Sequence, residues 1–439
     1  MAANTLPRTK SMHRPQPNNT LLNYSQAVRP KKNKSQFWQA ILAGILGICT
    51  TQSLEYIGTL KYDEIICVVC LLFYGLSKSF NRHFTSKAML GPLLAILLMS
   101  AAQLMADFAN SRPITDILKG HANFGFALTS TLFLTFLFKD RCAALIVYLI
   151  SRGVAGFFLK PTFHSDNSQL IADEYWDVRV AYWAAPLVIA GALILVRKQR
   201  YLVTAGIAVY GCAAVAFGGR SHGIAYIFCT LALIFATPQA RNRISQISAR
   251  TKRRIRRFIV YGILAFCLFF PVYVTLGLNG SLTDKAQRQL QTVRHPYNPL
   301  EVLLAGRGGI EVGAAAIGKR PILGYGSGNY NDDYLDGFPV RRDKGAIHSM
   351  MFESFAYGGF VVGCCYVALL WMFLQRCAKL IAVTDYRCTV IGSIYAVSFL
   401  WASLASPLQS FRLIFPIVFA ATFVFDQQMN NDSRKGFAK

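Results

Sequence analysis

The sequence predicts an all-α protein that crosses a membrane about twelve times and carries one long polar loop. Hydrophobic residues make up 54% of the chain and charged residues only 15%, a balance that water-soluble domains rarely have. Apolar runs of about 15 to 22 residues recur along the whole length, and such runs are typical of membrane-spanning helices. Basic residues gather in alternate connecting segments, and this asymmetry orients the helices.

The predicted elements divide the chain into five segments. Residues 1–35 are rich in proline, asparagine and lysine and contain no acidic residue, so we predict a disordered basic tail. Nine helices follow within 36–276, then the polar loop 277–347, three more helices within 348–425, and a short tail over 426–439. The predicted spans are 37–53, 65–77, 88–106, 122–138, 142–159, 178–196, 201–218, 223–236, 258–276, 349–374, 388–405 and 412–425.

The distribution of charge predicts which side of the membrane each segment faces. If both termini lie inside, the inner face carries 29 of the 46 lysines and arginines but only four of the 21 acidic residues. The remainder of the chain then holds 17 residues of each sign. Positive charge favours the cytoplasmic side, so the loop 277–347 is expected outside. The basic run 250–257 is expected to touch anionic lipid rather than nucleic acid, because it lies between two predicted spans.

The long loop contains local signals of its own. Asn298, Pro299 and Glu301 form a helix-start pattern, and the helix is expected to run to about Ile317 and to stop at Gly318. The following stretch, 321–330, is rich in turns and glycine. Its glycines do not follow a predicted strand, so they do not indicate a dinucleotide site, whereas a glycine-rich backbone can approach a ligand closely or expose amides to an anion.

Four residues in or near the outer segments are candidates for chemistry. Arg220 stands at the outer end of a predicted span, where a guanidinium suits either phosphate oxygens or lipid headgroups. Arg307 and Arg294 lie in the loop, and either one alone is typical of a solvated charge. His348 opens the tenth span and has a side chain that exchanges protons near neutral pH.

Two further charges, Arg152 and Glu353, fall within or at the edge of predicted spans and need partners. A pair between them is one possibility that the sequence leaves open.

Taken in order, these residues resemble a known membrane family, the O-antigen ligases and the O-antigen or exopolysaccharide polymerases. The resemblance is carried by Arg220, by Gly306 and Arg307, by the stretch from Pro321 to Gly326, and by His348 at the start of a helix. It covers the motifs from Phe217 to Gly363 and the topology of the whole chain. Two positions depart from the family pattern. Gly219 stands where a serine is frequent, and Ser349 stands where an asparagine is frequent.

The resemblance implies a glycosyltransferase of lipopolysaccharide biosynthesis in the bacterial inner membrane. A glycan on undecaprenyl diphosphate would move to a sugar hydroxyl of lipid A–core on the periplasmic side, without a cofactor or an essential metal. Arg220 and Arg307 would bind the donor diphosphate, with Arg294 contributing less, and His348 would be the general base. Arginines can neutralise the charge that grows on a leaving diphosphate, and a histidine can accept the hydroxyl proton.

Alternatives remain open at this point. A polymerase that joins repeat units shares these motifs, and transfer to a protein hydroxyl uses the same chemistry. A transporter or flippase for a charged lipid is a different class, and it should place ionisable groups near the middle of several spans. Here only Arg152 lies clearly in mid-span, whereas most polar residues are in one outer loop, so the sequence favours the transferase.

Overall fold

The computed structural model describes residues 34–55, 59–75, 77, 80, 83–139, 142–159, 179–217, 219–235, 260, 264, 267–282, 287, 290–291, 293–304, 309–328, 349–383 and 385–437. These residues are mostly helical. The two strands among them, β1 (Ser53–Glu55) and β2 (Thr59–Lys61), form a short antiparallel hairpin in which Leu54 faces Leu60. The predicted all-α class is therefore confirmed, whereas the predicted N-terminal tail over 1–33 lies outside the described residues.

Five of the described helices are long and apolar enough to cross a membrane, which supports a membrane protein. They are α4 (Lys87–Ala109), α5 (Ile114–Phe138), α16 (Met350–Ala382), α17 (Tyr386–Ala405) and α18 (Phe411–Phe437). Shorter helices lie over the other predicted spans, and the total of twelve spans stays a prediction. The shorter helices are α1 (Lys34–Cys49), α2 (Tyr62–Tyr74), α6 (Cys142–Phe158), α9 (Ala184–Leu195), α10 (Arg200–Ala216), α11 (Arg220–Phe235) and one over Cys267–Leu278.

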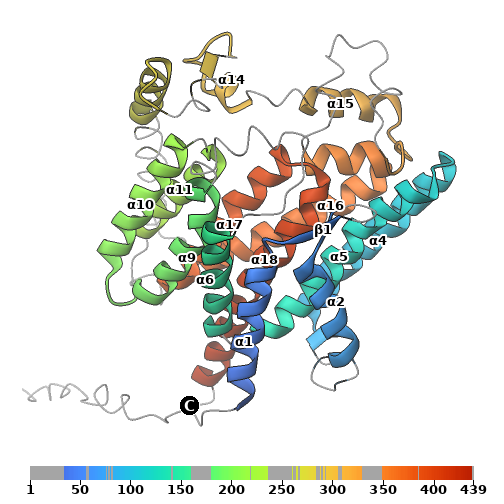
Figure 1. The fold of residues 1–439 in the computed structure, drawn as a ribbon, viewed down its shortest axis with the longest axis horizontal. Helices are drawn as coiled ribbons and strands as arrows, with labels where there is room; N and C mark the ends of the chain where they lie inside the picture. Colours follow the sequence, from blue (N-terminus) through green and yellow to red (C-terminus); the bar gives the residue numbers. More distant parts are fainter. Residues whose placement is uncertain are drawn as a thin grey trace, which may run out of the picture.

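The helices pack as neighbouring pairs around α16, α17 and α18. Helix α1 packs on α6, α10 on α11, α5 on α18, and α4 on α16. Two loop helices, α14 (Pro299–Leu304) and α15 (Gly309–Lys319), lie at one end of the molecule, and the C-terminal end of α18 lies at the other (Figure 1). This arrangement is the one expected if the polar loop and the C-terminus face opposite sides of a membrane.

Aromatic side chains fill the core between α17 and α18. On α18, Phe411, Phe415 and Phe419 recur every fourth residue, so they share one helix face, and consecutive ring centroids lie 4.9 and 5.3 Å apart. Phe399 of α17 packs against Phe415 at 5.7 Å. These rings fix α17 against α18.

Several boundaries differ from the sequence prediction. Helix α5 begins at Ile114 rather than at 122, so the outer connection between α4 and α5 is a tight turn. Of the polar residues that suggested a longer loop, Asp107 lies in α4 and His121 in α5, and the two contact each other. The loop helix expected over 298–317 is represented by α14 and α15, with 305–308 between them outside the described residues. Helix α18 continues through 426–437, where only a tail was expected.

Candidate functional site

The segment after α15 folds back onto α16 by backbone hydrogen bonds. Tyr325 N donates to Ala356 O at 2.9 Å, Gly326 N donates to Tyr357 O at 2.8 Å, and Phe360 N donates to Ile322 O at 3.1 Å. These bonds occupy the backbone amides of Tyr325 and Gly326, which the glycine-rich sequence suggested could bind an anion. The glycine-rich stretch is therefore a docking segment, and its amides at 325 and 326 are not a phosphate cradle.

Glycine is required where this segment meets α16. Gly324 has φ of 66° and Gly359 has φ of 67°, in the left-handed region that favours glycine. A Cβ on Gly324 would lie 2.5 Å from Tyr357 O, and one on Gly359 would lie 2.0 Å from Ile322 O. Gly359 also interrupts the helical backbone of α16. The carbonyls of Ala356 and Tyr357, just before this interruption, accept hydrogen bonds from the segment.

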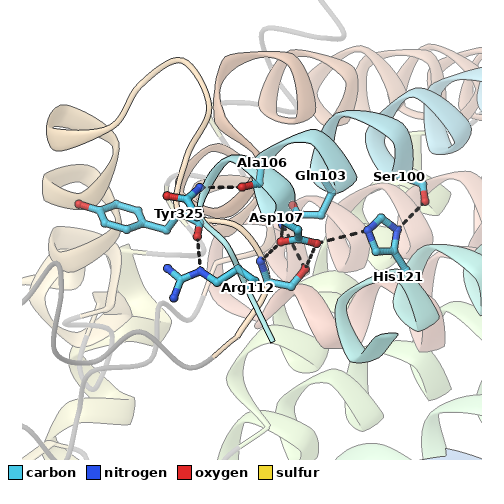
Figure 2. A network of polar contacts seen from close by, with 9 residues as sticks. Ser100, Gln103, Ala106, Asp107, Arg112, His121 and Tyr325 are labelled. Carbon is cyan, nitrogen blue, oxygen red and sulfur yellow. Dashed lines mark hydrogen bonds and ion pairs between the residues drawn. The ribbon is translucent and has the colours of Figure 1, made fainter. Parts of the chain in front are cut away.

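A buried carboxylate anchors the same segment from the opposite side (Figure 2). Asp107, near the end of α4, accepts hydrogen bonds from the backbone N of Ser327 and from Ser327 Oγ, the latter at 2.9 Å. Gln103 Nε2 donates to Ser327 Oγ at 3.2 Å. His121 Nε2 of α5 lies 3.3 Å from Asp107 Oδ2, and its Nδ1 is bonded to Ser100 Oγ at 3.0 Å.

This network does not form a nucleophile triad. The aspartate, rather than the histidine, contacts the Ser327 hydroxyl, so the serine–histidine–aspartate order of a triad is absent among the described contacts. Asn110 Nδ2 and Arg112 Nε add bonds to the carbonyls of Gly324 and Tyr325, at 3.2 and 2.8 Å. The network is a structural anchor.

The start of α16 is hydrogen-bonded to the end of α17 and to the connection between α17 and α18. Ser349 Oγ accepts from Phe352 N at 3.3 Å, which caps the helix, and donates to Ser403 O at 3.0 Å. The buried carboxylate of Glu353 accepts from Leu408 N. Glu353 is thus occupied by a backbone amide, and the pair with Arg152 that the sequence left open does not form among the described contacts.

Beside this junction, a cavity of about 490 Å³ lies between α6, α9, α11, α17 and α18. The turn η3 (Arg179–Trp183), a short π-helix, closes part of it. Its polar lining includes Arg152 of α6 and His222 of α11, and aromatic side chains surround them. Trp401 and Ser406 also line the cavity. In the chain they lie on either side of Ser403, whose carbonyl accepts a hydrogen bond from the Ser349 hydroxyl. The cavity therefore includes the first turn of α11 and the end of α17, to which the start of α16 is hydrogen-bonded.

The structure describes the sequence-predicted site residues unequally. Arg220 is the first residue of α11, two residues before the cavity residue His222, but its side chain is not described. His348 and Arg307 lie outside the described residues, although Ser349, which follows His348, is placed at the start of α16. Arg220 is thus close in the chain to the cavity residue His222, and Ser349, which follows His348, bonds Ser403 of α17, next to the lining residue Ala402.

Arg294 lies elsewhere. It is exposed on the turn before α14 and does not line the cavity. Next to it, His295 bonds Glu301 through both its ring Nδ1 (2.9 Å) and its backbone N (3.0 Å), and the ring bond lowers the pKa of the Glu301 carboxyl. Glu301 thus reaches back as expected: it accepts from the side-chain amide of the cap residue Asn298 at 3.2 Å as well as from His295 N.

Sequence reasoning did not assign Arg152, His222 or Asp107 to a site. The signals were present in part: Arg152 is a charge in mid-span, and His222 is close to Arg220 in the chain. The chain matches no protein-family model and no curated protein sequence. The family resemblance therefore rests on the motif residues alone.

Proposed function

We propose that the protein is an O-antigen ligase-like membrane glycosyltransferase. It transfers a glycan from undecaprenyl diphosphate to a sugar hydroxyl of lipid A–core on the periplasmic side of the bacterial inner membrane. We further propose twelve spans with both termini in the cytoplasm. The observation that carries the proposal is the cavity at the first turn of α11, which begins with Arg220, together with the bond from Ser349, the residue after His348, to Ser403 beside the cavity lining.

The proposed reaction is a single displacement at the anomeric carbon. The acceptor hydroxyl loses its proton to His348 as its oxygen bonds the anomeric carbon. The bond from that carbon to the diphosphate oxygen breaks, and the electron pair leaves with the lipid diphosphate. Arg220 and Arg307 neutralise the charge on this leaving group, which needs no general acid because a diphosphate is a stable anion. Arg294, exposed and outside the cavity lining, has a secondary role.

The acceptor distinguishes a ligase from a polymerase. The purified full-length protein in nanodiscs is given a lipid-linked glycan and either lipid A–core or a second lipid-linked repeat unit. A product on lipid A–core supports the ligase, and lengthening of the lipid-linked glycan supports the polymerase. Arg220→Ala should abolish either product, and Arg220→Lys should restore little because an ammonium cannot reproduce a bidentate fork. Absence of both products with the wild-type protein would overturn the proposed function.

A further inference from the structure

Two side chains that line the cavity leave buried nitrogen atoms without hydrogen-bond partners. They are Nε of Arg152 and Nδ1 of His222. The Arg152 charge acts on the imidazole of His222, so the two groups lie near one another, and the ring of Tyr182 packs on the His222 ring at 4.7 Å between centroids. Buried polar groups are normally hydrogen-bonded. Arg152 Nε is a donor, and His222 Nδ1 is a donor in one tautomer, so a single acceptor group could satisfy both.

The protein charges around Arg152 do not supply that acceptor. Asp63, Glu64, Arg152 and Arg412 all act on the charge of Lys61, so together with Lys61 they make three cations and two carboxylates, and Asp63 Oδ1 is itself buried without a hydrogen bond. Glu64 is committed, because its Oε1 lies 3.4 Å from Arg412 Nε and its Oε2 accepts from Lys61 N at 3.0 Å. Among the described residues no carboxylate forms an ion pair with Arg152. An excess positive charge beside a cavity favours an anionic ligand.

The rest of the lining indicates an amphiphile. The lining combines the polar and aromatic side chains of His222, Tyr182 and Trp401 with aliphatic side chains of α17 and α18 such as Ile394 and Ile417. A volume of about 490 Å³ accommodates a small headgroup with part of an apolar chain, and it falls in the range of ligand sites. A free inorganic anion would leave the apolar part of the cavity unfilled.

We propose that Arg152 and His222 bind the phosphate of a lipid, with the first part of its apolar chain against the inner wall of the cavity. The inference rests on the proposed function only for the identity of the lipid, which would be the polyprenyl carrier of the donor glycan. Arg152 and His222 then hold the phosphate attached to the prenyl chain, and Arg220 and Arg307 hold the phosphate attached to the glycan.

Lipid binding without turnover tests this assignment. The full-length protein in phosphatidylcholine nanodiscs is titrated with polyprenyl monophosphate, with uncharged polyprenol, with phosphatidic acid and with inorganic phosphate, and bound lipid is counted by native mass spectrometry. Arg152→Gln and His222→Gln should each weaken polyprenyl monophosphate about tenfold to a hundredfold and leave polyprenol unchanged. Arg197→Gln, which removes an exposed arginine paired with Asp385, is the matched control and should change nothing.

Each outcome decides one part of the proposal. Preference for polyprenyl monophosphate over phosphatidic acid identifies the prenyl carrier, and equal binding identifies a glycerolipid phosphate. Equal affinity for inorganic phosphate would overturn the lipid assignment. Arg152→Lys keeps the positive charge, so comparing it with Arg152→Gln separates loss of the charge from misfolding. If glycan transfer is normal while both glutamine variants bind like the wild type, this inference fails alone. If the wild type transfers no glycan but binding depends on Arg152, the proposed function fails alone.

Discussion

Replacing Asp107 with asparagine tests how the segment from Ile322 to Gly328 is held. The carboxylate accepts bonds from the backbone and hydroxyl of Ser327 and faces His121. Asparagine keeps one acceptor oxygen but turns an NH₂ group toward donors, so one charged hydrogen bond is lost. Such a bond contributes roughly 1.5–3 kcal/mol, and opening of the segment should become easier by about 2–3 kcal/mol.

Hydrogen exchange measures this opening directly. Because exchange of the Tyr325 and Gly326 amides requires the segment to leave α16, their exchange should accelerate about 30- to 150-fold in Asp107→Asn. Asp116→Asn, in the first turn of α5 and outside the network, is the control and should leave these amides unaffected. Equal protection of the peptide in all three proteins would show that Asp107 does not anchor the segment and would refute the reasoning.

Two further perturbations test the packing. Gly359→Ala places a methyl group 2.0 Å from Ile322 O at φ of 67°, so it should clearly lower the unfolding temperature. The control Gly125→Ala places its methyl group where no atom lies within 4 Å, so it should not lower that temperature. Equal unfolding temperatures for the two variants would contradict the requirement for glycine at 359. Burial lowers the pKa of Lys61 from 10.5 to about 8, so its charge destabilises the folded protein at pH values below about 8, and this cost is relieved as the pH rises toward 10.5. Stability should therefore rise between pH 8 and 10.5 more steeply in the wild type than in Lys61→Met, and parallel pH profiles of thermal unfolding would exclude this cause.

The sequence predicted the features that depend on local pattern. Apolar run length identified the membrane helices, and the Asn298–Glu301 pattern identified the start of α14. The role of the glycine-rich stretch was missed, because its hydrogen-bond partners, Ala356 and Tyr357, lie on a different helix and local pattern does not specify such contacts.

The cavity residues were missed for the same reason. Arg152 and His222 come from α6 and α11, and nothing in either segment alone shows that they share one cavity. The Arg152–Glu353 pair that the sequence left open does not form among the described contacts, because Glu353 accepts from the backbone N of Leu408, a contact that depends on the turn between α17 and α18. A buried charge was thus recognised from the sequence, but its surroundings required the three-dimensional packing.

Glycan transfer by a His348→Gln variant is the most direct test of the central proposal. The rate of transfer from the lipid-diphosphate donor to lipid A–core is compared with that of His295→Gln, which removes the exposed histidine paired with Glu301 in the same loop. Glutamine has no basic nitrogen, so the His348 variant should bind donor normally but turn over about 10²–10⁴ times more slowly, while the His295 variant stays within a few-fold of the wild type. A His348→Gln variant as active as His295→Gln would contradict the assignment of His348 as the general base.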